Sequence, residues 1–393
     1  MRGLDDLPLF ACGFRPMFLA GAAFAALAVP AWILLHAGGA TAWHALPAQL
    51  WHGHEMLFGF GLAAAAGFLL TAVPNWTSTP FRAGLPLAAT TLAWVGARLL
   101  LAPGLPLGWP AAAALQLAFL PAVIAMIAPP LLRTANRNRV LLLPLAALWA
   151  CDAVFLWAAA RADVRLASLV LAVTVDLLLV LVTVIGGRII PAFTANALRM
   201  RGEAPGTRTT AWLERALPGA MGLLAFADAL APTATINGAL AGLLALAHAW
   251  RLSGWEGWRT RGQPILWSLH LAYAWLPLGL ALKSAWLLGG LEVGRYWLHA
   301  LGAGTIATMV FAVITRVALG HSGRPLVVRP SIAAAYVLLH LGALLRVVGP
   351  AMFPEDYERV LAAAAIAWTL SFLCFLVVYA PILVSRRPDG KPG

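Results

Sequence analysis

The sequence predicts an all-α integral membrane protein, a polytopic bundle of about twelve transmembrane helices with both termini cytoplasmic. The first observation is composition: 62% of the 393 residues are hydrophobic and 11% are charged, whereas a soluble domain has about 25% charged residues. The second is that apolar runs of about 20 residues recur along the whole chain, whose mean hydropathy is +0.84. The third is an alternation of basic loops. Together they exclude an ordinary soluble enzyme and predict one integral membrane domain, residues 1–393.

Each apolar run is long enough to cross a hydrocarbon core of about 30 Å, at about 1.5 Å per helical residue. In chain order the predicted spans are 14–35, 54–73, 85–102, 111–132, 140–160, 166–186, 213–231, 233–251, 265–289, 295–319, 331–349 and 358–384. The connections are short and rich in glycine and proline, and none can form a soluble domain. The longest is the basic segment of about 187–212, where Pro191 is expected to break the sixth helix.

The basic residues test this count of spans. Of the 27 lysines and arginines, 20 lie in the loops and span ends of one side and 5 in those of the other, while Lys283 and Arg346 lie deeper within spans. Because basic loops stay in the cytoplasm, this asymmetry predicts that both termini are cytoplasmic. The net charge of +12 is therefore a topology signal and no nucleic-acid partner is expected. The three cysteines form no C-x-x-C pair, so no iron–sulfur site or disulfide framework is implied.

Isolated charges inside the spans are the first candidates for function, because ionisable residues at membrane depth are costly. They are Asp152, Asp176, Lys283 and Arg346. Asp176 has two interpretations that remain open, a proton-relay group or a protonated helix–helix hydrogen bonder. Arg98 and Arg346 lie near periplasmic ends of spans, where a guanidinium either binds a carboxylate such as a haem propionate or extends to the interface.

Histidines form two layers. His52 and His54 open the second span at the periplasmic face, and His299 lies at a similar depth. His299 lies near the start of its span and His321 follows the end of the same span. The two are therefore about 33 Å apart at about 1.5 Å per residue, and they cannot share a metal. His270 lies near the depth of His321. Imidazole is a common ligand of haem iron and copper, and the competing interpretation is a hydrogen-bonded interfacial histidine.

Local sequence narrows these options. His52 and His54 diverge by about 200° if both are helical, so they bind one metal only if His52 belongs to the preceding loop. His299 is followed by Gly302, Ala303 and Gly304. Such a face leaves room for a flat macrocycle or for a neighbouring helix. The other histidines, for which a hydrogen-bonded role is expected, are His36, His44, His248 and His340.

An ordered set of motifs resembles the NnrS family over nearly the entire chain. The motifs are G-F-R-P (13–16), W-H-G-H-E-M-L-F-G-F (51–60), G-F-L-L-T-A-V-P-N-W-T (67–77), G-G-R-I-I-P-A-F-T (186–194), L-H-L-A-Y-A-W (269–275), H-A-L-G-A-G (299–304) and T-R-V-A-L-G-H-S-G-R-P-L (315–326). The resemblance implies a haem- and copper-containing membrane protein of the response to nitric oxide and nitrosative stress. The histidines in its motifs, which are the candidate metal ligands, are His52, His54, His270, His299 and His321.

The leading hypothesis is thus a protein of the lipid bilayer that binds or processes nitric oxide. A b-type haem is assigned to His54 and His299, with Arg98 and Arg346 for its propionates. His270 and His321 are assigned to a second site, copper or a second haem. Reductive turnover would take electrons from quinol or a periplasmic donor and protons through Glu55, whereas sensing or metal protection needs no turnover. Whether it is an enzyme stays open.

The alternative is a twelve-helix secondary transporter for a metal or small anion, although the halves of the sequence show no convincing repeat.

Overall fold

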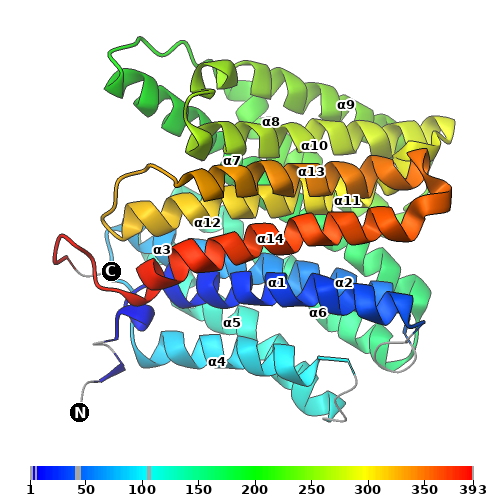
Figure 1. Ribbon diagram of the computed structural model, residues 1–393, viewed down its shortest axis with the longest axis horizontal. Coiled ribbons are helices and arrows are strands. Elements are labelled where there is room, and N and C mark those ends of the chain that lie inside the picture. The colour runs from blue at the N-terminus through cyan, green and yellow to red at the C-terminus, as the bar shows by residue number, and fades with distance from the viewer. Residues whose placement is uncertain (1–2, 5–6, 40–45, 104–107, 392–393) are drawn as a thin grey trace. The chain divides into compact units, whose positions relative to one another are not determined.

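The computed structural model describes residues 3–4, 7–39, 46–103 and 108–391, and its regular elements are helices (Figure 1). The chain forms two compact units. Unit 1 comprises Met1–Leu171, Ile314–Leu326 and Phe372–Gly393, and unit 2 comprises Ala172–Val313 and Val327–Ser371. Three helices, α7, α12 and α14, begin in one unit and end in the other.

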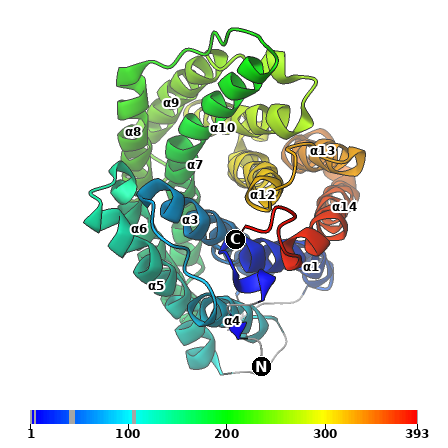
Figure 2. The same cartoon turned by 90° about the vertical axis from the view of Figure 1, so that its left-hand side faces the viewer.

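Unit 1 is built mainly from the first six helices. Their bounds are α1 Phe14–Ala37, α2 Ala48–His54, α3 Leu62–Thr77, α4 Leu85–Leu100, α5 Trp109–Arg133 and α6 Leu142–Ala160. Helix α3 packs against α1 and α5, and α5 also packs against α4 and α6. Figure 2 shows α5 between α4 and α6. The C-terminal end of α14 (Tyr357–Val384) joins this unit, where the Arg15 Nη1 donates to the carbonyls of Leu383 and Ser385 at 2.9 and 2.7 Å.

Unit 2 contains most of the remaining helices. Their bounds are α7 Val164–Met200, α8 Ala211–Leu230, α9 Thr235–Ser253, α10 Pro264–Gly289, α11 Trp297–His299, α12 Thr308–His321 and α13 Pro330–Met352. Helix α10 packs along α9, and the two lie side by side in Figure 1. Helix α9 also packs on α8, and α10 packs on the segment that follows α11.

All twelve predicted spans correspond to helical segments. Among the described residues, nine helices are long and apolar enough to cross a membrane. The helix α4 is apolar but has only 16 residues, and α8 and α9 do not meet the same criterion. The all-helical membrane fold is therefore confirmed, while the count of twelve spans, the orientation of the termini and the single domain stay predictions.

The sixth predicted span does not end where the sequence suggested. Pro191 lies inside α7, which continues to Met200. The expected break is wrong: Pro191 has no N–H to donate to the carbonyl of Gly187, four residues earlier, yet α7 continues through it. Gly187 also receives the Arg251 guanidinium, which leaves no space there for a Cβ. The Arg251 Nη1 donates to the Thr183 carbonyl at 2.8 Å, so polar groups from α9 support the helix here.

Two membrane helices contain π-helical turns directly after a histidine. The first π-segment, Glu55–Gly61, follows His54 and joins α2 to α3. The second π-segment, Ala300–Ala307, follows His299 and joins α11 to α12. Such segments are rare and occur frequently at functional sites. These two positions therefore direct attention to His54 in unit 1 and His299 in unit 2.

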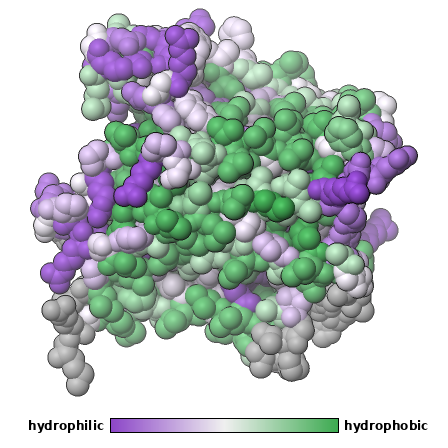
Figure 3. All heavy atoms as spheres, in the orientation of Figure 1, coloured by the Kyte–Doolittle hydropathy of each residue, from purple (hydrophilic) through white to green (hydrophobic). Residues whose placement is uncertain are grey.

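The surface follows the expectation for lipid-facing helices. In Figure 3, hydrophobic spheres cover the lengths of the helices on the visible face. Within unit 2, hydrophilic spheres gather over the connection between α7 and α8 and over the connection between α13 and α14. Polar residues thus lie at helix ends, as a bilayer requires.

Candidate functional site

Five buried side chains of unit 1 form a closed polar ring. His54 Nδ1 lies 2.9 Å from Glu55 Oε1, and His54 Nε2 lies 3.0 Å from Asp152 Oδ1. Asp152 Oδ2 accepts from the Gln116 amide, whose oxygen accepts from the Arg98 Nη2. An ion pair of 3.1 Å between Arg98 Nη1 and Glu55 Oε2 closes the ring. We call these residues, His54, Glu55, Arg98, Gln116 and Asp152, the polar ring.

Five helical elements position the polar ring. His54 ends α2 and Glu55 starts the first π-segment, while Arg98, Gln116 and Asp152 come from α4, α5 and α6. None of the five residues is more than 6% exposed. The His54 ring stacks on Phe155 at 4.7 Å between centroids, so an aromatic surface excludes water from one side of the imidazole.

Gly59 of the first π-segment makes room for Arg98. A Cβ on Gly59 would lie 2.6 Å from Arg98 Nη1 and 2.9 Å from the Phe24 ring. The Trp94 indole donates to the Gly59 carbonyl at 3.1 Å, which uses a backbone group beside the guanidinium. The π-segment thus brings backbone close to the ion pair of Arg98 and Glu55.

Charge within the polar ring is balanced. Glu55 and Asp152 are two carboxylates, and Arg98 is one cation. Because both nitrogens of His54 face carboxylate oxygens, each contact needs a proton, and an imidazolium supplies both. An imidazolium and a guanidinium then match the two carboxylates. Such a network is strong when complete and costly when one member is removed.

His52 and His54 point to different surroundings. Both lie on α2, so they diverge as helical geometry requires. The His52 ring stacks on Trp32 at 4.3 Å between centroids, whereas His54 stacks on Phe155. His52 and His54 could bind one metal together only if His52 lay in the loop before the helix. His52 lies in α2, so this condition is not met.

The second group of predicted residues lies in unit 2. His299 ends α11, directly before the second π-segment, and α13 packs against both elements. Arg346 of α13 lies with its guanidinium carbon 5.7 Å from the centroid of the Tyr296 ring. Its Nη1 is buried and makes no hydrogen bond. A buried guanidinium donor without an acceptor suits a carboxylate ligand.

The second π-segment has one open glycine and one crowded glycine. A Cβ on Gly302 would meet nothing within 4 Å, whereas a Cβ on Gly304 would lie 2.5 Å from the Trp275 ring. The Trp275 indole in turn donates to His340 Nδ1 at 3.1 Å. The face beside His299 therefore has space at Gly302 and tight packing one residue beyond Ala303.

His270 and His321 belong to different units. In unit 2, His270 Nε2 lies 2.8 Å from the Thr194 hydroxyl, and its Nδ1 is buried and makes no hydrogen bond. In unit 1, the His321 ring lies 6.0 Å from the Phe14 ring, and the His321 carbonyl accepts from Arg387 at 2.9 Å. His270 thus retains one imidazole nitrogen that hydrogen bonding within the chain does not use.

Three of the other histidines have hydrogen bonds, as expected for structural residues. His248 Nδ1 lies 2.7 Å from the Tyr273 hydroxyl, His340 accepts from Trp275, and His36 lies 3.2 Å from the Gln49 amide. His44 lies outside the described residues. In the described part of the chain, no three His, Cys, Asp or Glu side chains form a group that could hold a metal ion.

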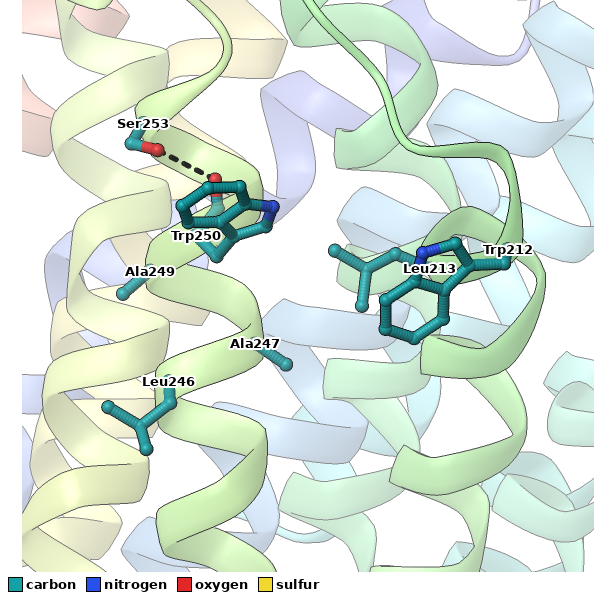
Figure 4. Close-up of a pocket in the computed structure, with 7 residues that line it drawn as sticks. All are labelled: Trp212, Leu213, Leu246, Ala247, Ala249, Trp250 and Ser253. Atoms are coloured by element: carbon teal, nitrogen blue, oxygen red, sulfur yellow. Dashed lines mark hydrogen bonds between the residues drawn. The ribbon is translucent and has the colours of Figure 1, made fainter.

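A shallow pocket in unit 2 is not a candidate for this chemistry. Its walls come from α8 and α9, whose side chains face each other across it in Figure 4. The lining residues are Trp212, Leu213, Leu246, Ala247, Ala249, Trp250 and Ser253. None of them is ionisable, and the two tryptophans are 64% and 65% exposed. Exposed indoles on apolar helices are typical of the membrane interface.

Sequence reasoning missed one member of the polar ring, Gln116, and did not identify the role of another, Asp152. Asp152 was visible as a lone charge in an apolar span, but its partner was not. Gln116 is the one hydrogen-bonding polar side chain in the predicted span 111–132. A polar side chain in an otherwise apolar span was the signal that would have found it.

Several glycines of the sequence motifs are sites of close packing. A Cβ on Gly53 would lie 2.6 Å from Leu171, and a Cβ on Gly67 would lie 2.6 Å from Phe18. Beside them, the Thr71 hydroxyl accepts from the Phe14 amide at 3.0 Å. The motifs therefore describe contacts between helices of unit 1 as well as the histidines.

Comparison with known proteins identifies one family. A family model described as NnrS protein matches residues 8–387. No curated protein matches the chain. Since the family model covers nearly the whole chain, the chain belongs to the NnrS family, and this membership suggests a membrane protein of the nitric oxide response.

Proposed function

We propose, from the premise that the chain belongs to the NnrS family, that it binds nitric oxide at a haem and protects against nitrosative stress. Its place is the bacterial inner membrane, with both termini in the cytoplasm. The family match over residues 8–387 is the observation that carries the proposal. Nine long apolar helices within the described part of the chain support the membrane location.

The residues of unit 2 fit a b-type haem. His299 offers an imidazole at the start of the second π-segment, and the open position of Gly302 suits a flat group beside it. The buried Arg346 Nη1 lacks an acceptor, which a propionate would supply. A bound haem would supply an iron able to bind nitric oxide.

The polar ring does not fit a haem as it stands. Both His54 nitrogens face carboxylates, so neither offers a lone pair to iron. Arg98 is engaged by Glu55 and Gln116, so it has no need of a propionate. We therefore place no haem chemistry on His54 or Arg98 and assign them to proton and charge stabilisation instead.

Copper is proposed to use His270. Its Nδ1 is buried and makes no hydrogen bond, while Thr194 orients the ring through Nε2. A ligating imidazole whose second nitrogen is held by a hydrogen bond is the usual arrangement. His52 and His321 remain further candidate ligands from the family motifs.

Glu55 is proposed to carry protons if the protein turns nitric oxide over. Reduction of two nitric oxide molecules to nitrous oxide and water takes two electrons and two protons, and quinol or a periplasmic protein would donate the electrons. Glu55 contacts both His54 and Arg98 in a buried network. A carboxylate between an imidazole and a guanidinium can pass a proton to or from the imidazole.

An optical spectrum tests the haem assignment. Purified protein is expected to show a Soret band that shifts on addition of nitric oxide, and His299→Ala is expected to lose or alter that band. His248→Ala is the control, because His248 is also a helical histidine but is buried and bonds Tyr273. Copper analysis of His270→Ala tests the second site. Wild-type protein without a Soret band would remove the haem proposal and favour the transporter.

A further inference from the structure

A second buried charge cluster lies in unit 2 and has no part in the proposed haem or copper sites. Asp176 is on α7, Asp228 on α8 and Lys283 on α10, and all three are at most 2% exposed. Both α7 and α10 are long enough to cross a membrane. Asp176 is 12 residues from the start of α7 at Val164, or about 18 Å along the helix. A short side chain cannot reach an interface from there.

Two members of this cluster are fully engaged. Lys283 Nζ contacts Asp228 Oδ2, and it lies 4.3 Å from the centroid of the Trp297 ring. The Asn237 amide of α9 donates to the other oxygen of Asp228 at 2.8 Å. The Asp228 carboxylate therefore has a partner for each oxygen, and the Lys283 ammonium has both an anion and an aromatic face.

Asp176 is different. Neither of its oxygens makes a hydrogen bond, and its nearest cationic atom, Lys283 Nζ, is 3.6 Å from Oδ2. The charged groups that act on it are Lys283 from α10 and Asp228 from α8. The neighbouring α9 contributes the neutral Asn237.

Charge counting then decides the state of Asp176. One ammonium and two carboxylates would leave one uncompensated negative charge among residues that solvent does not reach. Burying such a charge is very costly, and a carboxyl in this position neutralises instead. A metal cation would also neutralise it, but the Lys283 ammonium at 3.6 Å repels a second cation. A proton adds no bulk and no repulsive charge.

We propose that the Asp176 carboxyl, beside Asp228 and Lys283, is a proton-binding site of unit 2 that holds an exchangeable proton at neutral pH. Release of the proton leaves two carboxylates competing for Lys283, whose ammonium lies over Trp297, two residues before His299. The site is independent of haem and copper and does not rest on the proposed function.

Infrared spectroscopy of the full-length protein in lipid vesicles tests this site. The wild-type spectrum minus that of Asp176→Asn is expected to contain the carbonyl stretch of a protonated carboxyl at neutral pH. The band should move to lower frequency in heavy water, because the proton exchanges. It should also disappear as the pH rises, since the protonated form is lost above the pKa of the group.

Asp228→Asn makes the test specific. Without the second carboxylate, Asp176 becomes the sole counter-ion of Lys283, so the band is expected to disappear although Asp176 is present. Asp163→Asn, at an exposed helix start, should leave the band unchanged. If the Asp176→Asn variant fails to insert into the membrane, the Asp228→Asn spectrum and the wild-type pH titration still test the proposal.

Three results would overturn the proposal. The first is a wild-type spectrum without a protonated carboxyl band at neutral pH. The second is a band that persists in Asp228→Asn. The third is a band that sodium ions remove at constant pH, which would make this a cation site rather than a proton site.

Discussion

The two units handle buried charge in different ways. In unit 1, the polar ring pairs two carboxylates with a guanidinium and an imidazole, and each member contacts two others. In unit 2, two carboxylates share one ammonium. A balanced network needs nothing from outside the chain, whereas an unbalanced one must take a proton. The comparison suggests that the first cluster is electrically complete within the chain and that the second takes up a proton.

The strongest way to break this comparison is Arg98→Met. Removing one partner of a buried ion pair typically costs about 3–5 kcal/mol of stability. The polar ring would also then hold two carboxylates and one cation, the same count as unit 2. We therefore expect a large loss of stability in chemical unfolding in mixed micelles and a new protonated-carboxyl band in the infrared.

Arg295→Met is the control for this loss, because Arg295 forms an exposed pair with Glu292 at 3.6 Å. Exposed pairs contribute less than about 1 kcal/mol, so little change is expected there. An Arg98→Met protein that unfolds like wild type would show that the ring is not a stabilising network.

Lys283→Met should have the next largest effect. It leaves Asp176 and Asp228 without an ammonium, and we expect a loss of about 3 kcal/mol at neutral pH, as for an unpaired buried polar group. Two protonated carboxyls can hydrogen-bond each other, so the loss should shrink as the pH falls. Unfolding measured across pH checks this trend. A deficit that stays constant at every pH would contradict it.

A smaller effect separates the two π-segments. Gly59→Ala would bring a Cβ against Arg98 and Phe24 and should cost about 1–2 kcal/mol through overpacking. Gly302→Ala meets nothing within 4 Å and should stabilise the protein by about 0.4–1 kcal/mol, because alanine loses less backbone freedom. Thermal unfolding of the two variants should therefore shift in opposite directions. Equal destabilisation would show that the second segment has no open face.

The smallest effect concerns the C-terminal segment outside the membrane helices. The Arg387 guanidinium donates to Asp389 and lowers the pKa of that carboxyl. The stabilising contact is present above the ordinary carboxyl pKa and is lost only as the pH falls through the lowered value. Between about pH 5 and pH 8, resistance of this segment to carboxypeptidase should not change. A marked change in that range would show that the contact does not persist in solution.

Much of the fold could be predicted because a bilayer imposes length and apolarity on each span. The helices matched the predicted spans, and the departure at Pro191 came from a neighbour on α9, Arg251, that no local pattern reveals. The candidate site was harder. His54 and Glu55 were identified from their motif, but Asp152, which contacts His54, and Gln116, which donates to Asp152, lie about 60 to 100 residues away in sequence. Such contacts depend on how helices pack, which hydrophobic periodicity does not encode.

The π-segments also carry a consequence for helical phase. A turn closed by i→i+5 hydrogen bonds contains one residue more than an α-helical turn closed by i→i+4 bonds. In an α-helix one residue corresponds to about 100° of rotation. The residues before and after Glu55–Gly61 therefore follow two different helical wheels. A single wheel drawn through Ala48–Thr77 assigns the later residues to the wrong face. The histidine at each junction thus has a direction that is partly uncoupled from the helix that anchors it in the membrane.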